Sequence, residues 1–221
     1  MSIQIKPKTL RGEWTQGFAL DVHTTSKNGS SKGSFCACLN AHEEFIVTSV
    51  FIGGSRAISK LDDVIREQLE NLIAKHCAIL IGDANGTDKA VQKYFAQKQY
   101  PNVTVFCMQY CRNNIGGWQT RPITAPPKTK GFEYYASKDA AMAQQANCGL
   151  MLWDGESRGT LNNVLNLLGH GKKVMVYLEP CKSFYKLANE ADLDALLARC
   201  DPNTIQDLKR RLEPQLRFHQ L

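Results

Sequence analysis

The sequence predicts a doubly wound α/β fold, and three observations predict it. Apolar runs of strand length alternate with segments of helical periodicity between residues 44 and 180. These runs lack the polar alternation of half-exposed strands, as is typical of parallel strands covered on both faces. A glycine-containing turn follows three of the runs directly. Together these features indicate a Rossmann-like, mainly parallel five-stranded sheet, with an N-terminal β-hairpin extension and a C-terminal helical tail.

The first 43 residues are expected to form a separate extension. Strand-like runs at 17–24 and 34–39 flank a polar, glycine- and serine-rich stretch at 26–33, a pattern that predicts a β-hairpin with a long loop. With 221 residues and 43% hydrophobic content, the chain is large enough for one substantial core. We therefore divide the sequence into an extension at 1–43, a main domain at 44–180 and a helical extension at 181–221.

The elements of the main domain follow from these patterns in order. They are a strand at 45–52, a helix at 61–73, a strand at 77–81, a helix at 87–98, a strand at 103–107, a helix at 137–146, a strand at 149–153, a helix at 160–168 and a strand at 173–178. The Gly-, Asn- and Pro-rich stretch at 110–132 is interpreted as a loop or lid. After Pro180 the pattern becomes helical, and the turn at 201–204 is expected to cap the last helix.

The charge of the chain favours an anionic small molecule as its partner. The formal net charge is +6 and the pI is near 8.9, but the basic residues are scattered, which argues against nucleic acid. No stretch approaches the roughly 20 apolar residues that cross a bilayer, so we expect a cytoplasmic protein without membrane contact. The eight cysteines lack the spacing of a zinc site, and neither a metal nor a cofactor is expected.

Three glycine-containing turns form the candidate ligand site. Ligands of open parallel sheets bind beyond the carboxyl ends of the strands, where backbone amides, helix N-termini and arginine side chains can hold a phosphate. In the second turn, the Thr87 hydroxyl is available to cap the following helix. The candidate residues are Gly53, Gly54, Ser55 and Arg56 in the first turn, Gly82, Asp83, Gly86, Thr87 and Asp88 in the second, and Asp154, Gly155, Ser157, Arg158, Gly159 and Thr160 in the third.

Carboxylates near these turns are the catalytic candidates. Asp83 and Asp88 could each hold a ribose hydroxyl or act as a catalytic acid or base, and Asp88 is equally explained as a first-turn acid that stabilises its helix. Glu133 follows the long loop, and it either reaches the cleft or faces solvent. Neither a Gly-x-x-x-x-Gly-Lys-Ser/Thr nor a Gly-x-Gly-x-x-Gly pattern occurs, which disfavours ATP hydrolysis and dinucleotide redox chemistry.

Four spaced motifs occur in order between residues 45 and 178. They are Gly-Ser-Arg at 54–56, Gly-x-Ala-x-Gly-x-Asp at 82–88, Lys138-Asp139-x-x-Met142, and Trp-Asp-Gly-x-Ser-x-Gly-Thr at 153–160. This order resembles the YspA-type branch of the SLOG superfamily, to which the cytokinin-activating LOG phosphoribohydrolases also belong. The resemblance implies recognition of a nucleotide or nucleotide-derived signal, a ligand contact from Lys138, and self-association as a homo-oligomer. Asn163 stands where the LOG enzymes carry a catalytic acid, which weakens the case for hydrolysis.

Three functions follow as hypotheses. The favoured one is a sensor or ligand-binding protein for a nucleotide-derived molecule. The alternative is an enzyme that hydrolyses or transfers at the N-glycosidic bond of a nucleoside monophosphate, with Asp83, Asp88 or Glu133 as its acid. The weakest is an accessory role in DNA processing, because the basic residues form no stripe along which DNA would bind.

Overall fold

The computed structural model describes residues 47–216, with side chains as far as 212, and the predicted hairpin at 17–39 lies outside the described residues. The strands are β1 (Ser49–Gly54), β2 (Ala78–Ile81), β3 (Val103–Cys107), β4 (Gln119–Pro122), β5 (Cys148–Trp153), β6 (Val174–Leu178) and β7 (Ser183–Leu187). The helices are α1 (Asp63–Ala74), α2 (Thr87–Gln97), α3 (Gly131–Gln145), α4 (Arg158–Gly169), α5 (Glu190–Leu197) and α6 (Pro202–Leu216), with a short 3-10 helix at Glu179–Cys181.

The strands form one mostly parallel sheet in the order β4-β3-β2-β1-β5-β6-β7. The chain builds outward from β1 to β4 on one side, then returns to the centre and builds outward from β5 on the other. β1 therefore pairs in parallel with both β2 and β5. The direction of winding reverses between β1 and β5, and in open sheets of this kind the loops that leave two such strands diverge and open a crevice.

The sheet has seven strands in the described part of the chain, so the prediction of five was wrong. Both additional strands lie at edges. β4 lies inside the stretch interpreted as a loop; its four residues, Gln-Thr-Arg-Pro, are all exposed, so hydrophobic periodicity gives no sign of it. β7 lies inside the tail expected to be helical, and pairs antiparallel with β6. An edge strand needs only one neighbour, and its sequence can stay polar.

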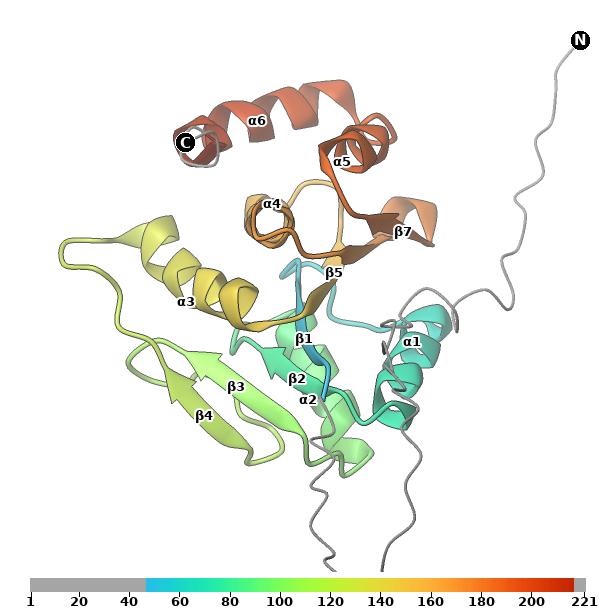
Figure 1. Cartoon of the computed structure of the whole chain (residues 1–221), viewed down its shortest axis with the longest axis vertical. Coiled ribbons are helices and arrows are strands. Elements are labelled where there is room, and N and C mark those ends of the chain that lie inside the picture. The colour runs from blue at the N-terminus through green and yellow to red at the C-terminus, as the bar shows by residue number, and fades with distance from the viewer. Residues whose placement is uncertain (1–46, 217–221) are drawn as a thin grey trace, which may run out of the picture. The chain divides into compact units, whose positions relative to one another are not determined.

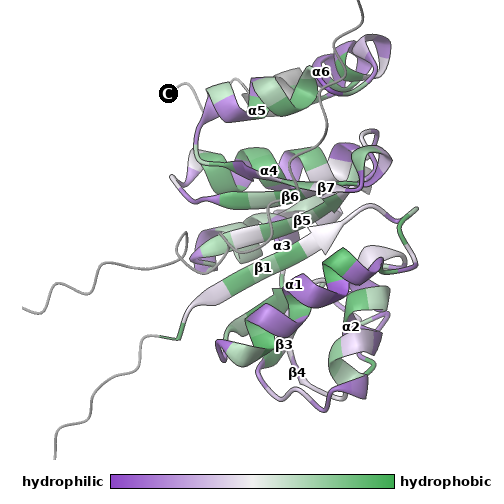
Figure 2. Ribbon diagram, turned by 90° about the vertical axis from the view of Figure 1, so that its right-hand side faces the viewer, coloured by the Kyte–Doolittle hydropathy of each residue, from purple (hydrophilic) through white to green (hydrophobic). Residues whose placement is uncertain are grey.

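Helices cover both faces of the sheet. Figure 1 shows α1 and α2 on one face, α3 and α4 on the other, and α6 outside α4. In Figure 2 the strand ribbons are largely hydrophobic while the helices carry mixed hydropathy, as expected when a sheet is enclosed and helices bury one side only. The bulkiest fully buried side chains include Phe51, Phe95, Phe106, Trp153 and Tyr177, four of which lie on strands.

The C-terminal helices belong to the same compact unit as the sheet. Leu193 on α5 and Leu208 on α6 are buried in the core cluster that includes Trp153. The predicted cap of the last helix is confirmed, because the Asp201 carboxylate accepts a hydrogen bond from the Thr204 amide at 2.8 Å. Among the described residues, no helix is long and apolar enough to cross a membrane.

Candidate functional site

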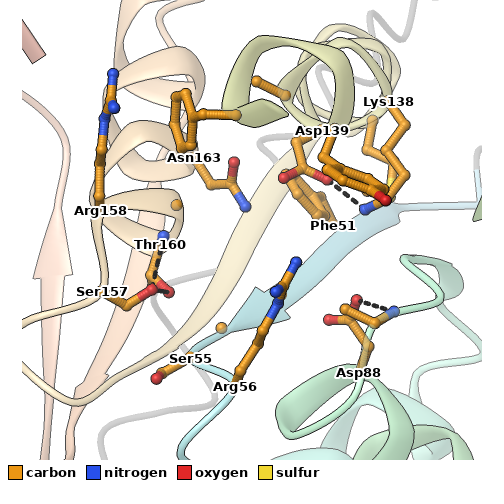
Figure 3. A pocket seen from close by; sticks show the side chains of 18 of the residues that line it. Phe51, Ser55, Arg56, Asp88, Lys138, Asp139, Ser157, Arg158, Thr160 and Asn163 are labelled. Atoms are coloured by element: carbon orange, nitrogen blue, oxygen red, sulfur yellow. Dashed lines mark hydrogen bonds and ion pairs between the residues drawn. The ribbon is translucent and has the colours of Figure 1, made fainter. Parts of the chain in front are cut away.

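A pocket of about 600 Å³ lies where the loops after β1 and β5 diverge (Figure 3). It lies at the carboxyl end of these two strands, the position expected for a ligand site in a sheet wound in this way. Eleven of the predicted residues line it: Gly53, Gly54, Ser55, Arg56, Asp88, Lys138, Asp154, Ser157, Arg158, Gly159 and Thr160. The first and third predicted turns are thus brought together, although about a hundred residues separate them in the sequence.

The first turn of α4 forms one wall of the pocket. Ser157 is the N-cap, and its hydroxyl oxygen accepts hydrogen bonds from the Thr160 amide at 3.4 Å and the Thr160 hydroxyl at 3.0 Å. Asp154 fixes the preceding loop, because its Oδ1 accepts hydrogen bonds from the amides of Glu156 and Ser157 at 3.1 and 2.8 Å. The amides of the first helical turn have no partner within the helix, and with the helix dipole they favour an anion at this wall.

The loop after β1 supplies a positive charge. Figure 3 shows the Arg56 side chain extending from this loop into the pocket, between α4 and α3. Within the described residues its guanidinium makes no hydrogen bond and no ion pair. The neighbouring Ser55 hydroxyl donates to the Asp154 carboxylate and so joins this loop to the loop that precedes α4. The first turn of α4 and the unpaired guanidinium are therefore held on connected loops.

Helix α3 forms the opposite wall, which the sequence reasoning largely missed. Its side chains at Phe132, Tyr135, Asp139 and Met142 all line the pocket. The helix begins at Gly131, six residues before the predicted start at 137, so Phe132 falls in the predicted loop and Tyr135 lies outside the predicted helix. The recurrence of these residues at intervals of three and four is the signal that would have placed them on one helical face.

A buried polar cluster closes the base of the pocket. Lys138, only 4% exposed, donates to the Asp139 carboxylate at 2.6 Å, and Asp88, 7% exposed, accepts from the Ala84 amide at 3.0 Å. Burial raises the pKa of Asp88 to about 6, although the Lys138 charge opposes the shift. Burial acts to lower the pKa of Lys138, but the charges of Asp139 and Asp88 outweigh it and the pKa is raised. A charged lysine thus lies beside a carboxyl group that titrates near neutral pH.

The raised pKa of Asp88 predicts a specific pH dependence of stability. Its pKa is higher in the folded chain than the ordinary value of about 4, so the folded state binds the proton more tightly. The contribution of this group to stability is therefore full at low pH and is lost as the pH rises from about 4 to about 6. Asp88→Asn should remove that loss, so we expect the difference in melting temperature between variant and wild type to change across this window, measured by thermal unfolding. Parallel curves for the two proteins would contradict the shift.

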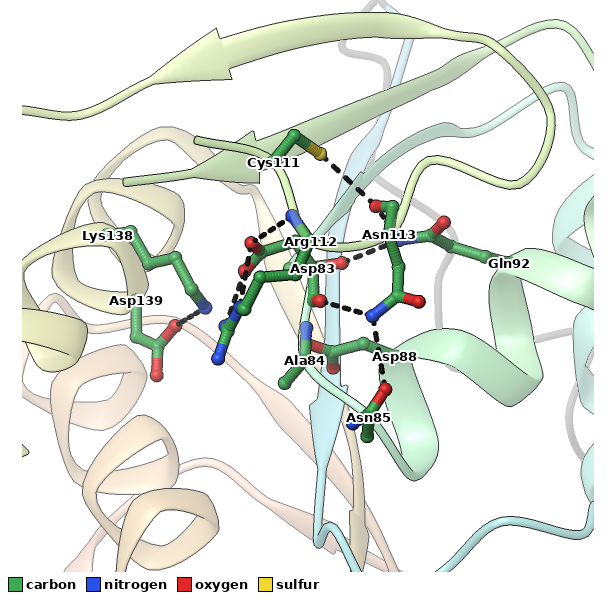
Figure 4. A network of polar contacts seen from close by, with 11 residues as sticks. Asp83, Ala84, Asn85, Asp88, Gln92, Cys111, Arg112, Asn113, Lys138 and Asp139 are labelled. Carbon is green, nitrogen blue, oxygen red and sulfur yellow. Dashed lines mark hydrogen bonds and ion pairs between the residues drawn. The ribbon is translucent and has the colours of Figure 1, made fainter. Parts of the chain in front are cut away.

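Asp83 has a structural partner instead of a place on the pocket wall (Figure 4). It is 1% exposed, and its carboxylate accepts hydrogen bonds from Arg112 Nε at 3.0 Å, Arg112 Nη2 at 2.7 Å and the Arg112 amide at 3.1 Å. Burial acts to raise the pKa of Asp83, but the bonds from Arg112 outweigh it and hold the pKa below its ordinary value. The pair joins the loop after β2 to the loop after β3, and Arg112 itself lines the pocket.

The other predicted residues also lie off the pocket wall. Glu133 is exposed in the first turn of α3, and Gly155 is buried within the loop before α4. Thr87 does not cap its helix, since the N-cap is Gly86, and the Thr87 hydroxyl instead donates to the Ser55 carbonyl at 2.9 Å. A Cβ atom on Gly82 would lie 2.4 Å from Asp88 Oδ2, so this glycine makes room for the polar cluster. The glycine-containing turn at 82–88 thus supports the one at 53–56.

The residues of the pocket do not suggest a metal centre. In the part of the chain that the structure describes, no group of three or more His, Cys, Asp or Glu side chains is placed to hold a metal ion. Two of its carboxylates are instead engaged with protein donors, Asp139 with Lys138 and Asp154 with Ser55.

No protein-family model and no curated protein matches this sequence. One solved structure resembles it, the DNA processing protein A from Helicobacter pylori, described for its unique mode of binding single-stranded DNA. The two share 11% sequence identity with a TM-score of 0.46, over 76% of this chain and 81% of that one. Likeness of this degree carries no conclusion about the ligand of the present chain. The resemblance to the SLOG superfamily, the self-association and the cytoplasmic location stay predictions.

Proposed function

We propose that this chain binds a nucleotide or nucleotide-derived phosphate in the pocket between β1 and β5, as a sensor or ligand-binding protein with a Rossmann-like fold. One observation carries the proposal: the unpaired Arg56 guanidinium and the first turn of α4 line the same pocket. A guanidinium forms two parallel hydrogen bonds with a phosphate, and helix amides add further donors. The Arg56 guanidinium is available for this contact, since no described carboxylate neutralises its charge.

Three other basic side chains line the pocket, and the guanidinium carbon of one of them, Arg158 on α4, lies 3.9 Å from the centre of the Phe132 ring. Arg112 is paired with Asp83, and Lys138 with Asp139. The end of the pocket at Arg56 and α4 is therefore where an incoming anion finds uncompensated donors, and the phosphate is expected to bind there.

The wall opposite that end suits the remainder of a nucleotide. Phe132 and Tyr135 present aromatic rings from α3, and Met142 adds an apolar, polarisable surface. A volume of about 600 Å³ lies within the range of small-molecule pockets, which combine apolar walls with a few oriented polar groups. A phosphate at α4 and a base or another flat group against α3 would use both parts of the pocket.

The test is calorimetric titration with a panel of nucleoside mono-, di- and triphosphates, cyclic nucleotides and a single-stranded DNA oligonucleotide. We expect a nucleotide to bind the wild type, and Arg56→Ala to weaken it by about tenfold to a hundredfold, the range for a hydrogen bond to a charged group. Lys93→Ala removes the same charge from an exposed position of α2 outside the pocket and should bind as wild type. Failure of every nucleotide to bind would refute the proposal, and salt-dependent binding of DNA alone would favour the DNA-processing alternative.

Hydrolysis of an N-glycosidic bond is the second candidate, and Asp88 favours it. Of the three predicted catalytic carboxylates only Asp88 lines the pocket, and its pKa of about 6 lets it hold a proton near neutral pH. A carboxylic acid in that state can protonate the leaving base, as the general acid does in glycoside hydrolysis. Chromatography of the same titration samples separates the candidates: free base that appears with wild type but not with Asp88→Asn indicates the enzyme, and intact nucleotide indicates the binding protein.

A further inference from the structure

Asn163 on α4 has an unusual environment for a buried polar side chain. It is only 5% exposed, it lines the pocket, and within the described structure its Oδ1 atom has no hydrogen-bond partner. Figure 3 shows its amide directed from α4 into the pocket, with the oxygen on the side of α3 and the nitrogen on the side from which Arg56 enters. A buried acceptor without a partner destabilises a folded protein, and native structures satisfy nearly all such groups. An acceptor left in this state on a pocket wall is suited to a donor that arrives with the ligand.

The position of Asn163 along α4 indicates which part of the ligand it meets. It follows Gly159 in the first turn by four residues, which is about 6 Å along the helix axis. The groups one turn apart on a helix share a face. A phosphate held at the first turn therefore places the atoms next to its ester oxygen near Asn163. In a nucleotide those atoms belong to the sugar, whose hydroxyl groups are hydrogen-bond donors.

We infer that Asn163 is a specificity-determining residue whose Oδ1 accepts a hydrogen bond from a sugar hydroxyl of the phosphorylated ligand. This inference rests on the proposed function and makes it more specific, because it requires a ligand that carries both a phosphate and a hydroxyl-bearing sugar. A sugar phosphate and a ribonucleotide share this chemistry. A ligand that lacks the hydroxyl leaves the acceptor unpaired in the complex, and sites built for a hydroxyl reject such analogues strongly.

Asn163→Leu is the decisive variant, because leucine has a similar size and no acceptor. Without ligand we expect it to melt at a higher temperature than wild type, since it removes the unpaired buried oxygen. Leucine also favours helices more than asparagine does. Asn166→Leu controls for this effect, because Asn166 lies one turn further along α4 and outside the pocket. The increase in melting temperature should be larger for Asn163→Leu than for Asn166→Leu.

The binding experiment uses ribose 5-phosphate, the four common ribonucleoside monophosphates and the 2′,3′-dideoxy form of each nucleotide. We expect wild type to bind a ribonucleotide or the sugar phosphate about tenfold or more tightly than Asn163→Leu does, and the dideoxy nucleotide to bind both proteins equally. Binding of ribose 5-phosphate as tightly as the nucleotides would identify the sugar phosphate as the ligand.

The two proposals fail in different ways. If wild type binds none of the compounds in either panel, the proposed function fails and this inference fails with it. If wild type binds a ribonucleotide and its dideoxy form equally well, the inference alone is overturned; this comparison needs no variant and stands even if Asn163→Leu does not fold. Equal affinity of Asn163→Leu and wild type for the ribonucleotide overturns it as well.

Discussion

Gly86→Ala should lower the free energy of unfolding by about 3 kcal/mol, the sum expected from overpacking and a strained backbone. Gly86 has a φ of +81°, and a Cβ atom there would lie 2.3 Å from the Arg56 carbonyl oxygen and 2.4 Å from its Cα. Both are backbone atoms, so no side-chain rotation relieves the contact. The loop after β1 must move away from α2, and Arg56 moves with it. Equilibrium denaturation in urea measures the loss, and weaker nucleotide binding by the folded fraction should accompany it.

Gly117→Ala separates the two sources of that loss. Gly117 also has a positive φ, +66°, but no heavy atom lies within 4 Å of the position that its Cβ would take. This variant has the backbone strain without the steric clash, so its free energy of unfolding should be lower than that of wild type by about 1 kcal/mol. A loss at Gly86 no larger than the loss at Gly117 would mean that the contact with Arg56 is easily relieved.

The centre of this fold is predictable from the sequence, and its edges are not. β3 occupies 103–107 as predicted. Strands buried on both faces need a continuous apolar run, and such a run can be recognised in the sequence. β4 leaves no such trace, since all its residues are exposed, and β7 carries mixed polar and aromatic residues. These two strands are determined by a neighbouring strand that offers free hydrogen-bonding groups. That information lies in the tertiary structure.

The candidate site shows the same division. The turns at 53–56 and 154–160 were predicted because glycine, serine and arginine at the end of a strand have a local physical meaning. The role of Asp83 depends on Arg112, which is distant in sequence, and that of Asn163 on its Oδ1 having no described hydrogen-bond partner. Sequence alone can show that a carboxylate follows a strand. It cannot show whether that carboxylate meets a ligand or an arginine.

Arg112→Met should reduce stability by about 3 kcal/mol at pH 7, because removal of one partner leaves a buried carboxylate uncompensated. Asp83 is 1% exposed, and after the substitution only the Arg112 backbone amide still donates to it from that residue. Arg210→Met is the matched control: its ion pair with Asp207 lies on the surface of α6, and its loss should cost less than about 0.5 kcal/mol.

The dependence on pH and a double variant test whether the charge of Asp83 is the cause. The pKa of Asp83 is lowered in the wild type, so its stabilising contribution is present above the ordinary value of about 4 and is lost as the pH falls through the lower folded value. The difference in the free energy of unfolding between wild type and Arg112→Met, measured by urea denaturation, should therefore be largest at pH 7. It should become smaller below about pH 4. Asp83→Asn combined with Arg112→Met removes both charges and should be more stable than Arg112→Met alone. A pH-independent difference, or a double variant no more stable than the single one, would mean that Arg112 acts through packing against Tyr135, whose ring centre lies 4.9 Å from its guanidinium carbon.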